Sequence, residues 1–134
     1  MGQRDNPNDG HFLDRQRQRL QALRDELLQS ERDSLSEERT LEAERTDRPR
    51  DDGEDAVNDA LREVDRTQHD RAGIRLTTIE RALEKIREGT YGLSDASDRP
   101  ISRDRLEAVP EAIYTVEEET RIEEGWVPPP RARL

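Results

Sequence analysis

The fold is decided by a break in a helical pattern, the segment Thr46-Asp-Arg-Pro-Arg-Asp-Asp-Gly53. Pro49 disfavours helical backbone at the residue before it, and Gly53 permits a tight turn. From His11 to about Arg45 the chain contains no Gly or Pro and is rich in Leu, Glu, Arg and Gln, which are good helix formers. We therefore predict one long helix that ends at this turn.

The first helix carries a narrow apolar stripe. Leu13, Leu20 and Leu27 are spaced by heptads, and the stripe continues through Leu28 and Leu35 to Leu41. Such spacing is typical of a coiled-coil seam rather than of a broad core face.

A second helical pattern starts near Glu54 and ends at Gly89, a residue that favours helix C-caps. Its stripe consists of Val57, Leu61, Val64, Leu76, Ile79, Leu83 and Ile86. Two helices of similar length joined by a short turn pack best as an antiparallel hairpin within one chain. We therefore predict a coiled-coil hairpin at 11–89, with its tip at 46–56, in a monomeric protein.

The rest of the chain is punctuated by Gly92, Pro100 and Pro110 and predicts a small compact module at 90–125. Ser102 is suited to cap a short helix through Ala108, and a second short helix is expected over 115–124. We expect the module core to consist of Tyr91, Leu93, Ile101, Leu106, Ile113, Tyr114, Val116 and Trp126. Residues 1–10 read as a flexible tail, and the prolines of 126–134 favour an extended tail.

Composition limits the possible functions. The chain has 134 residues, a net charge of −10, 42% charged residues and no cysteine. The acidity argues against direct binding to nucleic acid or to anionic membranes, because phosphate binding needs clustered positive charge. There is no apolar run long enough to span a membrane and no secretory signal. We expect a soluble, cytoplasmic protein of the mainly α class.

Catalytic and cofactor signals are missing as well. The sequence shows no nucleophile–base pair and no Gly-rich phosphate loop, and it holds only two histidines, His11 and His69. We therefore expect no enzyme activity and no cofactor. His69 falls in a polar gap of the second helix and is expected to be a half-exposed or seam-interrupting residue rather than a ligand.

Two segments carry a resemblance to a known family. They are Leu83-Glu-Lys-Ile-Arg-Glu-Gly-Thr-Tyr-Gly92 and Arg105-Leu-Glu-Ala108 with the following Pro110. Together they resemble the DksA/TraR family, in which a coiled-coil hairpin is joined to a small four-cysteine zinc finger. The resemblance implies a transcription regulator that enters the secondary channel of bacterial RNA polymerase without binding DNA.

The zinc ligands of that family are missing here. The resemblance places the two Cys-x-x-Cys pairs of the family on Ser94 and Ser97, then on Thr115 and Glu118. Zinc prefers Cys, His and carboxylate ligands, usually four in a structural site, and hydroxyl groups substitute poorly for thiolates. We therefore predict a zinc-finger-like module that lacks metal and is held by packing.

The family also carries an acidic motif at the hairpin tip. The resemblance places it on Asp51, Glu54, Asp55 and Ala56, which would form the polymerase-binding tip. A purely structural interpretation is also open, because acids at a helix N-terminus cap the helix and complement its dipole.

Two further expectations follow from the comparison of residues. The family uses basic side chains to contact the alarmone ppGpp, and the matching positions here, Thr78 and Glu119, are not basic. They argue against a ppGpp response.

The alternative function is a structural or adaptor coiled coil that binds another protein partner.

Overall fold

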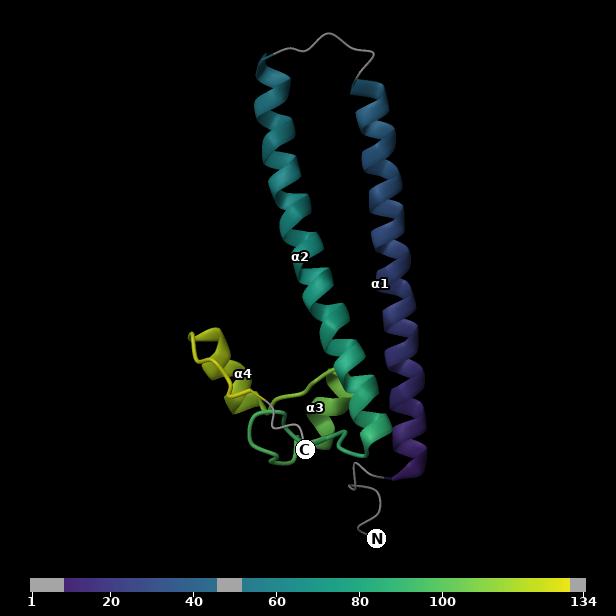
Figure 1. Cartoon of the computed structure of the whole chain (residues 1–134), viewed down its shortest axis with the longest axis vertical. Coiled ribbons are helices and arrows are strands. Elements are labelled where there is room, and N and C mark those ends of the chain that lie inside the picture. Colours follow the sequence, from purple (N-terminus) through teal and green to yellow (C-terminus); the bar gives the residue numbers. More distant parts are fainter. Residues whose placement is uncertain (1–8, 46–51, 131–134) are drawn as a thin grey trace. The chain divides into compact units, whose positions relative to one another are not determined.

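The computed structural model describes residues 9–45 and 52–130, and within these ranges the side chains of Arg45, 52–58 and Asp65 are excluded. Four helices follow one another along the chain: α1 (Gly10–Arg45), α2 (Asp52–Glu88), α3 (Arg103–Ala108) and α4 (Val116–Glu123). Helices α1 and α2 run side by side as an antiparallel hairpin (Figure 1). The prediction of a mainly α fold built on a helical hairpin with a small C-terminal module is confirmed.

The predicted helix ends agree with the structure. Helix α2 ends at Glu88, and Gly89 takes a left-handed φ of 81°. The amide of Thr90 donates to the carbonyl of Lys85 (2.9 Å), and the amide of Gly89 donates to that of Ile86 (3.3 Å). This pair of bonds is a Schellman motif, which satisfies carbonyls that the helix leaves unpaired.

The chain forms two compact units. Among the described residues, the terminal unit comprises 9–23 and 77–130, and the middle unit comprises 24–45 and 52–76. Every apolar side chain that is fully buried among the described residues belongs to the terminal unit: Phe12, Leu20, Ile79, Ala82, Leu83, Tyr91, Ile101, Leu106 and Ala112. The expected domain boundary at Gly89 remains a prediction, although the first turns of α1 and the last turns of α2 share a unit with the module.

In the middle unit the predicted narrow stripe is only partly covered. Leu35 is 48% exposed and Leu41 is 59% exposed. On α2, Leu61 is 58% exposed and Val64 is 54% exposed. The physical reason is that two helices alone can cover each other only along one narrow face, and here no described third element covers the rest.

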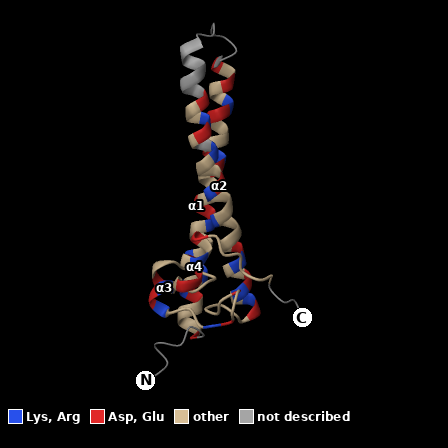
Figure 2. Cartoon of the chain, turned by 90° about the vertical axis from the view of Figure 1, so that its left-hand side faces the viewer, with Lys and Arg blue, Asp and Glu red and all other residues tan. Residues whose placement is uncertain are grey.

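Polar contacts join the helices of the middle unit. Nδ1 of His69 on α2 lies 2.8 Å from Oε2 of Glu31 on α1, and His69 is half-buried. Charged residues of both signs are distributed along the described parts of both helices (Figure 2). No helix of the described residues is long and apolar enough to cross a membrane.

Both short helices of the module begin within one residue of their predicted starts. The Ser102 hydroxyl accepts a hydrogen bond from the amide of Arg105 (3.2 Å), and α3 follows. Thr115 caps α4 in the same way, through the amide of Glu118. Of the expected module core, Tyr91, Ile101 and Leu106 are buried. The others are half-buried, namely Leu93, Ile113, Tyr114 and Trp126, except for Val116, the first residue of α4, which is 51% exposed.

Candidate functional site

The predicted polymerase-binding tip lies mostly outside what the structure describes. Asp51 lies outside the described residues, and so do the side chains of Glu54, Asp55 and Ala56. The backbone shows that α2 begins at Asp52, so Glu54 and Asp55 occupy its first turn. Acids in a first turn favour helix formation, which keeps the capping interpretation open beside the binding one.

The four positions that match the zinc ligands of the family come together in the terminal unit. Ser94 begins a tight turn in which its own carbonyl accepts from the amide of Asp98 (3.0 Å). The Ser94 hydroxyl donates to Oε1 of Glu118 (2.6 Å), the third residue of α4. The same carboxylate oxygen accepts from the amide of Thr115 (2.9 Å). The four-residue set is called the Ser94–Glu118 cluster below and consists of Ser94, Ser97, Thr115 and Glu118.

Glu118 is a buried acid, only 7% exposed. Burial opposes its ionisation, but hydrogen bonds from Ser94, Ser97 and Thr115 outweigh that effect and lower its pKa to about 2. The carboxylate is therefore ionised at neutral pH and is compensated by hydrogen bonds.

This donor set does not fit zinc. Three of the four side chains are neutral hydroxyls, and the carboxylate already accepts hydrogen bonds from two of its neighbours. Zinc sites in proteins need ligands with free lone pairs, mostly thiolate, imidazole or carboxylate. Among the described residues no group of three or more His, Cys, Asp or Glu side chains is placed to hold a metal ion.

A buried polar network, which the sequence pattern missed, attaches α1 to the module. Nε2 of Gln16 donates to the hydroxyl of Tyr91 (3.0 Å) and to the carbonyl of Leu106 (2.7 Å). The Tyr91 hydroxyl in turn donates to the carbonyl of Pro110 (2.8 Å). Burial raises the pKa of Tyr91 to about 12, so the phenol keeps the proton that it donates. Because glutamine is polar, the sequence pattern did not identify position 16 as part of the core. Only its spacing of four residues from Phe12 and from Leu20 could have indicated that it is buried.

A second network attaches α2 to the module. The Asp95 carboxylate accepts from Nε and Nη2 of Arg81 (2.8 and 2.9 Å) and from Nζ of Lys85 (2.6 Å). Burial opposes ionisation of Asp95, but these two cations outweigh it and its pKa is lowered. The sequence gives no local signal for this pair of partners, because they lie on different elements.

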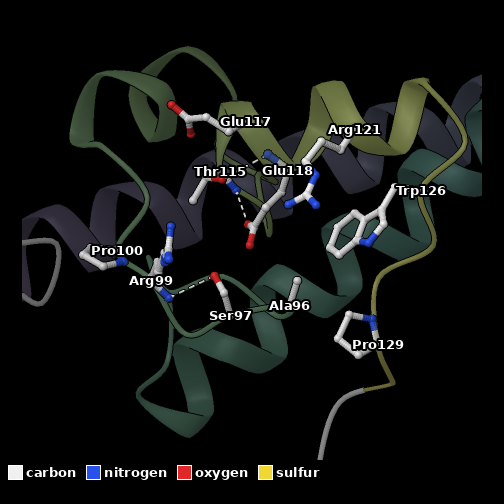
Figure 3. A pocket seen from close by; sticks show the side chains of 10 residues that line it. All are labelled: Ala96, Ser97, Arg99, Pro100, Thr115, Glu117, Glu118, Arg121, Trp126 and Pro129. Atoms are coloured by element: carbon white, nitrogen blue, oxygen red, sulfur yellow. Dashed lines mark hydrogen bonds between the residues drawn. The ribbon is translucent and has the colours of Figure 1, made fainter.

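A cavity of ≈ 540 Å³ lies beside the Ser94–Glu118 cluster (Figure 3). Trp126 borders it, as do Arg99, Arg121 and Pro129. The guanidinium of Arg121 lies over the indole ring of Trp126, 4.9 Å from the ring centroid. Trp126 is half-buried, in agreement with the expectation that it packs on the module.

Comparisons with known proteins identify relatives of this chain. No protein-family model matches the chain. The RNA polymerase-binding transcription factor DksA of Caulobacter vibrioides is 31% identical over 107 residues, which cover 80% of this chain and 72% of that protein. General stress protein 16O of Bacillus subtilis is 43% identical over 49 residues, covering 37% of this chain and 30% of that protein.

A solved structure extends the similarity to the fold. The transcription factor DksA2 from Pseudomonas aeruginosa superposes with a TM-score of 0.70 at 29% identity, over 87% of each chain. The helical hairpin, the attached module and the similarity over most of both sequences lead to the same assignment. This cysteine-free chain belongs to the DksA family.

Proposed function

We propose that this protein binds bacterial RNA polymerase and regulates transcription, with its helical hairpin entering the secondary channel of the enzyme. The observation that carries the proposal is the 31% identity over 80% of the chain to a protein named as an RNA polymerase-binding transcription factor. The long α1–α2 hairpin supports it, because a pair of helices is narrow enough to enter a channel.

The tip of the hairpin supplies the proposed contact. Glu54 and Asp55 lie in the first turn of α2, and Asp51 directly precedes this helix in the sequence. Acidic side chains there would meet basic loops of the polymerase or the region of its catalytic magnesium. In this proposal the protein acts as a monomer in the cytoplasm, changes the stability of promoter complexes, performs no covalent chemistry and does not bind DNA directly.

In vitro transcription with purified polymerase tests the proposal. The variant D51A/E54A/D55A should bind more weakly and lose the effect on transcription. A matched control, E26A/E37A/E44A, removes the same charge from exposed positions of α1 and should act like the unmodified protein. Equal activity of both triple variants would exclude the tip as the contact. A shift of promoter DNA by this protein alone would exclude a mechanism without DNA binding.

One observation favours the alternative, an adaptor that binds some other protein. Leu35, Leu41, Leu61 and Val64 of the middle unit are about half exposed, and a partner helix could cover them. Failure of the protein to bind polymerase in a pull-down, with the purified protein folded, would favour this alternative over the polymerase proposal.

A further inference from the structure

The hydroxyl of Ser94 has all of its hydrogen-bonding capacity in use. Ser94 is fully buried, and its Oγ accepts from the amides of Ala96 (3.0 Å) and Ser97 (3.3 Å). A serine hydroxyl has two lone pairs and one proton. With both lone pairs occupied, the proton is directed to its remaining partner, the Glu118 carboxylate at 2.6 Å.

Glu118 receives donors from two separate elements. The Ser94 hydroxyl comes from the turn that precedes α3 and donates to Oε1 of Glu118. The Thr115 amide comes from the residue that caps α4, and the Thr115 hydroxyl accepts from the Glu118 amide (3.2 Å). Oε1 of Glu118 therefore accepts from one O–H and one N–H group, and the cap of α4 and the turn at 94–97 share this one acceptor.

We propose that the Glu118 carboxylate is the structural centre of the module, an internal anion that ties the 94–97 turn to α4. The charge arrangement of this cluster is the reverse of that in a metal site. Here hydrogen-bond donors face an anion, whereas in a metal site negative ligands surround a cation. A cation in this position would be repelled by the Ser94 proton, which is directed toward the carboxylate. The lone pairs of Ser94 already accept hydrogen bonds and could not coordinate it. Charge-assisted hydrogen bonds of this type are about twice as strong as neutral ones, so one buried anion with several donors can fix both elements.

The single tryptophan offers a local measurement. Trp126 borders the cavity beside Glu118, so its fluorescence reports on the module, whereas circular dichroism is dominated by α1 and α2. We expect E118Q to lower the midpoint of the fluorescence-detected thermal transition by about 5 °C, since it loses charge-assisted bonds. Glutamine is acceptable in a capping box, so this variant keeps the cap of α4 and isolates the role of the charge.

The matched control is E117Q, which removes the same charge from an exposed residue in the same helical turn. Its midpoint should stay within about 1 °C, as surface substitutions cost little. Equal midpoints for E118Q and E117Q would overturn the proposal. Failure of E118Q alone to give a native fluorescence spectrum, with E117Q native, would support it.

Two further measurements test coupling and polarity. If Ser94 and Glu118 act as a unit, the midpoint loss of S94A/E118Q should be clearly smaller than the sum of the two single losses, whereas additive losses would count against the proposal. Zinc chloride added to the unmodified protein should leave the midpoint unchanged. A saturable rise at one zinc per chain would show that the cluster accepts a cation, and the proposed polarity would be wrong.

Discussion

The terminal and middle units are built from the same two helices, yet they bury their apolar residues very differently. Leu20 is fully buried where α1 belongs to the terminal unit, whereas Leu41 of the same helix is 59% exposed in the middle unit. The difference lies in the additional elements of the terminal unit, since α3 and the surrounding turns contribute Tyr91, Ile101 and Leu106 to its core. Heptad spacing shows where a helix could be covered, and only a third element makes the covering complete.

The largest expected effect comes from removing a core leucine. Leu106→Ala should lower the free energy of unfolding by about 2–5 kcal/mol, because it leaves a cavity in a closed core. Leu41→Ala, a matched change in the middle unit, should cost well under half as much. Urea unfolding measures both, and similar losses would show that the two units are equally packed.

A smaller loss is expected from the network of Gln16. Gln16→Ala should cost about 1–3 kcal/mol, because it leaves the buried carbonyl of Leu106 without its side-chain donor. Gln18→Ala, at an exposed position two residues further along α1, is the control and should be nearly neutral. If both glutamine variants unfold at the same urea concentration, the network does not stabilise the terminal unit.

Mild acid should weaken the terminal unit. The pKa of Glu118 is about 2 in the folded protein, compared with its ordinary value of 4.5. Its ionised carboxylate therefore stabilises the folded state fully above pH 4.5, and this stabilisation is lost as the pH falls toward 2. At pH 3.5 the loss from this group alone should be about 1 kcal/mol. The stabilisation that Asp95 contributes is also lost as the pH falls, because its pKa is lowered in the folded protein as well. In urea unfolding followed by Trp126 fluorescence, E118Q should lose less stability than the unmodified protein between pH 7 and pH 3.5.

A chelator is expected to have no effect on the protein. The protein contains no cysteine, and its Ser94–Glu118 cluster does not fit zinc, so EDTA should leave circular dichroism and Trp126 fluorescence unchanged. Elemental analysis should find no stoichiometric zinc in the purified protein. One zinc per chain, released together with loss of structure, would contradict this prediction.

Local signals in the sequence predicted the elements well. Gly89 and Ser102 act within a few residues of the chain, and they end α2 and begin α3 where their chemistry suggests. Long-range partners were not predictable in this way. Gln16 meets Tyr91 across much of the chain, and Lys85 meets Asp95 on another element.

The same distinction between local signals and long-range contacts applies to the candidate sites. The family resemblance located the Ser94–Glu118 cluster by residue number, but no pattern indicated that its members hydrogen-bond to one another. The exposure of the stripe in the middle unit could not be predicted, because periodicity does not report what lies opposite a helix face. The roles of Asp51, Glu54, Asp55 and Ala56 remain predictions.

The chain has a single lysine, Lys85, and its side chain is only 2% exposed, with Nζ held 2.6 Å from Asp95. Amine-directed reagents therefore meet no accessible lysine on the folded protein. An acetyl group or an amine-reactive dye reaches Lys85 only when the terminal unit opens, so the rate of labelling at this residue measures the frequency of that opening. Trypsin cleaves after Lys85 only while its amine is unmodified, so labelling replaces the two fragments 82–85 and 86–87 with the single fragment 82–87. The proportion of this longer fragment therefore measures how often the terminal unit has opened.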